Sequence, residues 1–96
     1  MTLTSNNRAF ALLLTPVMRR LRSCYANESI NHPGKLEIIW EGGTLALLSI
    51  NENGVVLFTY VDSHWLPSIS SASAQNPVEL SLSEAFGVFE EVAKSR

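Results

Sequence analysis

The stretch Lys35–Asp62, KLEIIWEGGTLALLSINENGVVLFTYVD, alternates between apolar runs and turns that contain glycine. Runs rich in Ile, Val, Leu and aromatic residues that are bounded by Gly and Asn are typical of short β-strands. We therefore expect an antiparallel β-meander of three consecutive strands, which span Leu36–Glu41, Thr44–Ile50 and Val55–Val61.

Two turns set the register of this meander. Gly42-Gly43 is predicted to be a two-residue hairpin loop, which would pair Glu41 with Thr44. The residue types of Asn51–Gly54 are typical of a three-residue loop closed by a glycine with positive φ, which would pair the first asparagine with Val55. Because side chains alternate between the two faces of a strand, these pairings decide which residues share a face.

Both faces of the predicted sheet are substantially apolar. The face that we expect to contact the core consists of Leu36, Ile38, Trp40, Leu45, Leu47, Val55, Leu57 and Val61. The second face is polar only along its first strand and consists of Glu37, Ile39, Glu41, Ala46, Leu48, Ile50, Val56, Phe58 and Tyr60. A two-residue Asn53-Gly54 loop would instead flip the third strand, and both faces would still be substantially apolar.

A sheet with one wet side is normally polar on that side, so the second face needs a cover. One interpretation is that a helix covers each face. The other is that both helices pack on one face and that the second face contacts a partner. The second interpretation predicts a protein interface made of Leu48, Ile50, Val56, Phe58 and Tyr60.

An amphipathic helix is predicted before the meander, and Ser5, Asn6 and Asn7 are residue types that cap helix starts. Pro16 interrupts the helical pattern without changing its phase, so we expect a kinked or briefly broken helix with one buried stripe. The polar stretch Tyr25–Gly34 is predicted to be a loop. The buried stripe of the helix consists of Phe10, Leu13, Leu14, Val17, Leu21 and Cys24.

After the meander, residues 63–76 are predicted to form a long irregular loop, followed by a short edge strand at Pro77–Leu80. Trp65 either packs this loop against the edge of the core or anchors an interface, as tryptophan often does. Ser81 and Glu84 have the spacing of a capping box, which predicts a C-terminal helix from this point. The apolar positions of that helix are Leu82, Ala85, Phe86, Phe89, Val92 and Ala93. The whole chain, residues 1–96, is thus predicted to be one α+β domain of order α-β-β-β-α.

The composition excludes several classes of function. The net charge of −2 is too small to indicate a highly charged partner. The single cysteine, Cys24, rules out a disulfide within the chain and fits a reducing cytoplasm. There is no run of about twenty apolar residues, so no membrane span is expected. The apolar run of residues 9–18 is followed by arginines where an export signal would need small residues, so we also expect no export.

No catalytic, cofactor or metal motif is present in the sequence. Zinc needs about four ligands at motif spacing, whereas His32, His64 and Cys24 are widely separated. A small hydrolase that uses His64 or Cys24 is the third hypothesis. A cysteine on an apolar stripe is, however, typical of a small buried hydrophobe.

The leading hypothesis is a non-enzymatic protein-binding module: a cytoplasmic regulator, inhibitor or adaptor. It would bind another protein, or form a homodimer, through the second sheet face and Trp65. Small acidic domains without catalytic motifs are common among phage and mobile-element inhibitors of host machinery. The chain could therefore be a phage accessory protein. The alternative is a nucleic-acid-binding protein that uses a helix face formed by Arg19, Arg20 and Arg22. The ordinary explanation of these arginines is a solvated surface near a helix C-terminus.

Overall fold

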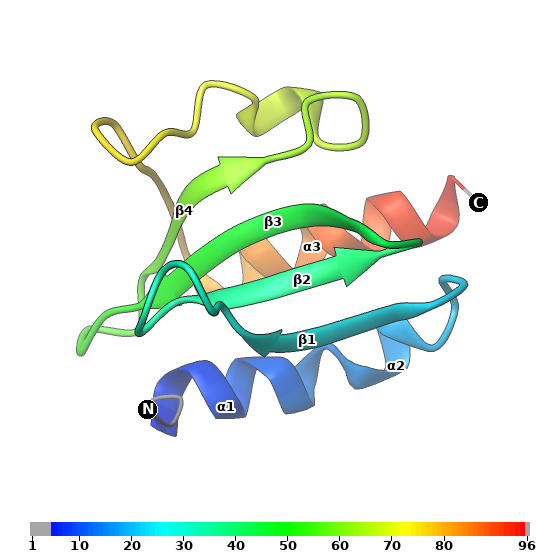
Figure 1. Cartoon of the computed structure of the whole chain (residues 1–96), viewed down its shortest axis with the longest axis horizontal. Coiled ribbons are helices and arrows are strands. Elements are labelled where there is room, and N and C mark those ends of the chain that lie inside the picture. The colour runs from blue at the N-terminus through cyan, green and yellow to red at the C-terminus, as the bar shows by residue number, and fades with distance from the viewer. Residues whose placement is uncertain (1–4, 96) are drawn as a thin grey trace.

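The computed structural model describes residues 5–95 and shows an α+β fold. Five antiparallel strands form one sheet in the order β1-β2-β3-β4-β5 (Figure 1). The strands are β1 (Cys24–Glu28), β2 (Leu36–Trp40), β3 (Gly43–Ile50), β4 (Val56–Val61) and β5 (Val78–Leu80). The helices are α1 (Ser5–Leu13), α2 (Thr15–Met18) and α3 (Leu82–Lys94), and a short 3-10 helix, η1, spans Pro67–Ile69.

The predicted fold class and the antiparallel sheet are confirmed, but the sheet is larger than the predicted meander. The meander corresponds to β2, β3 and β4, and β5 is the predicted edge strand at Pro77–Leu80. Strand β1 lies in a stretch that was predicted to be a loop, so that prediction is wrong for Tyr25–Glu28. The residues of β1 alternate between half-buried and exposed, as in an edge strand with one solvated side.

The helices α1 and α3 pack on the same face of the sheet. The ring centroids of Phe10 in α1 and Phe89 in α3 are 6.4 Å apart, and Phe89 lies 6.0 Å from Phe58 of β4. Figure 1 shows the helices together behind and below the strands. Among the described residues, no helix covers the opposite face. The sheet residues buried in the core are Leu36, Ile38, Trp40, Leu45, Ala46, Leu48, Ile50, Val56, Phe58 and Val61.

The first hairpin turn is formed by Glu41 and Gly42, not by the predicted pair of glycines. Both residues have positive φ angles, 53° and 82°, and Trp40 pairs with Gly43. Two positive φ angles define the type I′ turn, whose twist matches that of the strands. The pair next to the turn is thus Trp40–Gly43 instead of the predicted Glu41–Thr44. Because both strands are shifted by one residue, this change alone would leave the predicted faces as they were.

A β-bulge at Leu45 changes the faces. Ile39 pairs with Thr44, but the next residue, Ile38, pairs with Ala46, so Leu45 is the extra residue. Beyond the bulge, Leu36 pairs with Leu48. Because a shift of one residue turns side chains to the opposite face, the rest of β3 is inverted relative to the prediction.

The second turn is formed as predicted. The amide of Asn51 donates to the carbonyl of Val55 at 3.0 Å, and Gly54 has a φ of 79°. Ile50 therefore pairs with Val56. A second bulge, at Thr59, then brings Tyr60 opposite Leu47. Tyr60 therefore shares a face with Glu37, as predicted, whereas the part of β4 before this bulge is inverted.

The N-terminal helix is broken next to Pro16, as predicted, because α1 ends at Leu13 and α2 begins at Thr15. It ends earlier than predicted, however: α2 stops at Met18, and Cys24 belongs to β1. Leu13 is 50% exposed rather than buried. The other members of the predicted stripe, Phe10, Leu14, Val17 and Leu21, are buried in the core.

Asn7 lies inside α1 and fastens the helix to the sheet. Its side-chain amide donates to the carbonyl of Gly34 at 2.9 Å and its Oδ1 accepts from the amide of Ile50 at 2.9 Å. It is therefore not a cap, and Asn6 likewise lies in the helix, where it donates to the carbonyl of Asn51. Helix α1 is described from Ser5, so its cap lies outside the described residues.

The C-terminal part follows the predictions closely. The Ser81 hydroxyl accepts from the amide of Glu84, and the Glu84 carboxylate accepts from the amide of Ser81, which is the predicted capping box. In the long loop, Leu66 and Ile69 are buried against the core. The ring of Trp65 lies edge-on against Trp40, with centroids 4.6 Å apart.

Candidate functional site

The helix-free face of the sheet, here called the outer face, is the candidate site. The register of the strands shows which side chains lie next to one another on this face. Tyr25 lies beside Ile39, Leu47 lies beside Tyr60, and Leu57 lies between Ser49 and Glu79. The outer face consists of Tyr25, Asn27, Glu37, Ile39, Thr44, Leu47, Ser49, Leu57, Tyr60 and Glu79.

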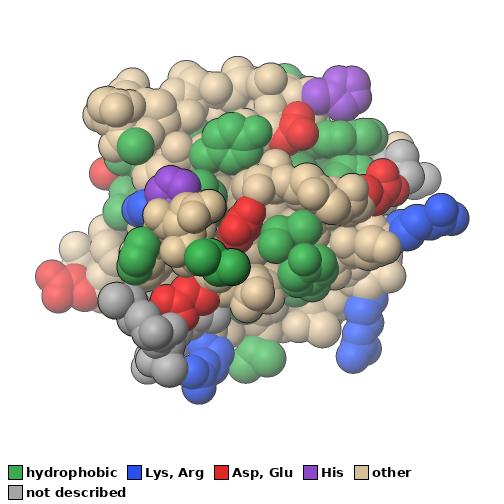
Figure 2. All heavy atoms as spheres, in the orientation of Figure 1, with side chains coloured by type: hydrophobic (Ala, Val, Ile, Leu, Met, Phe, Trp, Pro, Cys, Tyr) green, Lys and Arg blue, Asp and Glu red, His purple; other side chains and the backbone are tan. Residues whose placement is uncertain are grey.

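The apolar side chains of the outer face are accessible. Tyr25 is 52% exposed and Tyr60 is 44% exposed, and Ile39, Leu47 and Leu57 are half-buried. Figure 2, which has the orientation of Figure 1, shows hydrophobic side chains gathered on the front of the molecule with carboxylates between them. This face is therefore an apolar surface with polar interruptions.

Glu37 is the charged residue nearest the middle of the outer face. Its carboxylate accepts a hydrogen bond from the hydroxyl of Thr44. The two residues line a hollow of about 370 Å³ together with Leu47, Tyr60 and His32. The outer face is therefore not flat at this point.

Ser29 and His32 at the margin of this hollow resemble a catalytic pair by residue type only. The hydroxyl of Ser29 lies 3.4 Å from Nδ1 of His32 and accepts from the amide of His32 at 3.2 Å. Ser29 is only 4% exposed. A nucleophile must reach its substrate, so we assign this contact to the loop between β1 and β2.

The predicted interface residues lie on two different faces. Leu48, Val56 and Phe58 are fully buried and Ile50 is 8% exposed, so they form the core and cannot form a surface. The prediction that they make an exposed face is wrong, because the bulge at Leu45 turns them toward the helices together with the residues of β2. Tyr60 does lie on the outer face. Trp65, which was predicted to be either a core residue or an interface anchor, is half-buried beside Trp40.

The inversion within β3 and β4 also explains why the exposed residues Leu47 and Leu57 were not predicted. Ile39 was placed on the helix-free face as the structure has it, but Leu47 and Leu57 were assigned to the core. Neither Leu45 nor Thr59 carries a bulge signal such as glycine, so no feature of the sequence marks the inversion. Only the low polarity of both predicted faces indicated that an apolar surface would remain.

The arginines of the alternative hypothesis do not lie on a helix face. Arg19, Arg20 and Arg22 are exposed, but they lie in the turn between α2 and β1. The predicted helix face is wrong because the helix ends at Met18. Binding of nucleic acid by these arginines stays a prediction.

The structure gives neither Cys24 nor His64, the residues of the hydrolase hypothesis, the surroundings of a catalytic nucleophile or base. Burial raises the pKa of the Cys24 thiol to about 11, which keeps it protonated near neutral pH, whereas the thiolate is the nucleophile. The carboxylate of Asp62 accepts from the backbone amide of His64 at 3.0 Å, which is a turn contact. Within residues 5–95, no three side chains of His, Cys, Asp and Glu lie close enough to hold a metal ion.

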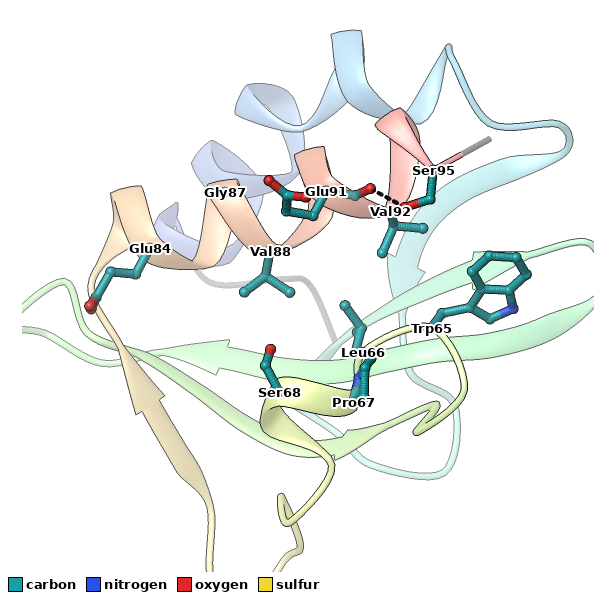
Figure 3. Close-up of a pocket in the computed structure, with 10 residues that line it drawn as sticks. All are labelled: Trp65, Leu66, Pro67, Ser68, Glu84, Gly87, Val88, Glu91, Val92 and Ser95. Carbon is teal, nitrogen blue, oxygen red and sulfur yellow. Dashed lines mark hydrogen bonds between the residues drawn. The ribbon is translucent and has the colours of Figure 1, made fainter.

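A second hollow, of about 570 Å³, lies between α3 and the long loop. In Figure 3, Val88 and Val92 point from the helix toward Leu66 of the loop, and the carboxylates of Glu84 and Glu91 lie at the rim. Gly87 borders this hollow, and a Cβ atom at its position would meet no atom within 4 Å. Its missing side chain is therefore not required by packing within the described chain.

The chain matches no protein-family model, no curated protein and no solved structure, so its function has to be argued from its own surfaces. None of the helices described in residues 5–95 has the length and apolar character needed to cross a membrane.

Proposed function

We propose that this chain is a non-enzymatic protein-binding module that pairs with a second copy of itself through the outer face. One observation carries the proposal: α1 and α3 share one face of the sheet, which leaves apolar side chains on the other face without a cover. Exposed apolar surface on small proteins commonly marks an interaction site.

The charge distribution of the outer face favours a second copy as its partner. The apolar side chains near its centre, Ile39, Leu47 and Leu57, are uncharged, and the carboxylate of Glu37, which pairs with Leu47, is hydrogen-bonded to the hydroxyl of Thr44. Such a centre is complementary to another uncharged apolar surface, which an identical copy supplies. A two-fold axis would bring the same side chains together from both copies, and two sheets would pack about 10 Å apart, as in a β-sandwich.

The size of the face sets the expected strength of the dimer. Five strands about 4.8 Å apart and a longest strand of 8 residues give a face of on the order of 500 Å² in projection. Specific interfaces commonly bury about 800 Å² per partner, so this contact lies at the weak end of that range. We therefore expect dimers at high micromolar concentration and monomers in dilute solution.

Sedimentation equilibrium over a wide concentration range tests this proposal. The wild type should show a reversible monomer–dimer equilibrium, and Leu47→Asp should remain monomeric because it places a charge at the centre of the interface. Leu12→Asp is the matched control, since Leu12 is 69% exposed on α1, away from the outer face. A wild type that stays monomeric at the highest concentrations, or dimers that survive Leu47→Asp, would contradict the proposal.

We place such a module among cytoplasmic regulators, inhibitors or adaptors. The one cysteine fits a reducing compartment. A weak dimer whose population follows its concentration is also suited to regulation.

A further inference from the structure

Strand β1 is an edge of the sheet whose outward backbone groups can be assigned. The amide of Ser29 donates to the carbonyl of Lys35, and the amide of Glu41 donates to the carbonyl of Ser23. Hydrogen-bonded pairs alternate along an antiparallel ladder, so the odd-numbered residues between them also bond β2. The N–H and C=O groups of Cys24 and Ala26 therefore point away from the sheet. Outside the strand ladder, no backbone hydrogen bond among the described residues uses these four groups.

A groove of about 360 Å³ runs beside this edge, between β1 and the helices α1 and α2. Cys24 and Ala26 are on the helix side of β1, because they pair with the core residues Trp40 and Ile38. Their small side chains leave the space open. The opposite wall includes Leu12, which is 69% exposed, and Met18.

The two ends of the groove are positively charged. Arg8 and Arg19 both line it, and no Asp or Glu is among its lining residues. The two arginines are eleven positions apart along the nearly continuous helices α1 and α2, which corresponds to about 16 Å. A β-strand covers that distance in about five residues.

We propose that the β1 edge binds an extended segment of another protein that carries apolar residues and has an acidic residue near each end. The segment would add a sixth strand, with backbone hydrogen bonds to Cys24 and Ala26. Alternate side chains of an added strand face the helices, so one apolar side chain would enter the groove beside Leu12. The carboxylates would pair with Arg8 and Arg19, which excludes segments with basic ends. This site is separate from the outer face and does not depend on dimerisation.

The probe is a random-peptide display library selected on the full-length protein, followed by amide hydrogen exchange with a synthetic copy of the most enriched peptide. We expect enriched sequences with apolar residues between acidic ones. The bound peptide should slow exchange of the Cys24 and Ala26 amides at least about tenfold, as new hydrogen bonds do. The amides of Tyr25 and Asn27, which already bond β2, should change little. Absence of enrichment, enrichment of basic peptides, or unchanged exchange at Cys24 and Ala26 would overturn the proposal.

Two variants separate strand addition from simple contact with the groove. Ala26→Pro removes an outward N–H, a change that edge strands tolerate, and should weaken binding about tenfold. Arg19→Glu leaves the strand intact and should weaken binding by a similar factor. Leu47→Asp on the outer face is the control and should bind as the wild type does. Full binding by Arg19→Glu would refute the acidic specificity even if Ala26→Pro failed to fold.

Discussion

Asn7 shows how one buried side chain can hold the helical layer on the sheet. It is 1% exposed, and its amide group bonds both the loop that precedes β2 and the last residue of β3. Asn7→Ala would leave the amide of Ile50 and the carbonyl of Gly34 without these partners. Because buried unsatisfied groups are costly, we expect a loss of about 2–3 kcal/mol in the free energy of unfolding, measured by urea denaturation.

The neighbouring Asn6 provides the control for this prediction. It is exposed and makes one hydrogen bond, to the carbonyl of Asn51. Asn6→Ala should therefore cost less than about 1 kcal/mol. If both variants lost the same free energy of unfolding, burial of the Asn7 side chain would not explain its contribution to stability.

Gly87 is a residue whose replacement should stabilise the protein. It lies inside α3, its φ is negative, and a Cβ atom there would meet nothing within 4 Å. Gly87→Ala should therefore raise the free energy of unfolding by about 0.5–1 kcal/mol through helix propensity. Gly54→Ala should do the opposite, because Gly54 has a φ of 79°. A destabilised Gly87→Ala variant would mean that the helix needs this glycine for packing.

At the scale of elements, features set by local patterns were more predictable than the register of the strands. The capping box of α3 is a local pattern, because Ser81 and Glu84 bond each other's backbone within one turn. The Asn51–Gly54 turn is local for the same reason. The bulges at Leu45 and Thr59 depend on how whole strands fit the helices, so residue types at those positions do not reveal them.

The capping box gives α3 an acid-sensitive start. The hydrogen bond from the backbone of Ser81 lowers the pKa of the Glu84 carboxyl in the folded protein. A carboxyl with a lowered folded pKa stabilises the protein above its unfolded pKa, and this contribution is lost as the pH falls through the folded pKa. Glu84→Gln should thus be less stable than the wild type near neutral pH, and the difference should shrink in acid. Thermal unfolding at about pH 7 and about pH 3 would test this, and an equal difference at both would contradict it.

At the scale of the whole molecule, the sequence was sufficient for the α+β class, and an apolar face without a helix was one of the two interpretations that it left open. It was not sufficient for the identity of that face. The bulge at Leu45 exchanged Leu47 and Leu57 with Leu48 and Phe58, and the short edge strand β1 follows a turn that the helical pattern did not reveal. The total apolar surface depends on composition, whereas its location depends on long-range register.

The measurement that tests the account most directly is an isotope-filtered NOE experiment on a concentrated equal mixture of ¹³C-labelled and unlabelled protein. Only contacts between two copies give signals in this experiment. The account predicts intermolecular NOEs from the methyl groups of Ile39, Leu47 and Leu57, because these lie at the centre of the outer face. Intermolecular NOEs confined to Leu12 and Leu13 on α1, or none at any concentration, would contradict the claim that the helix-free face pairs two copies.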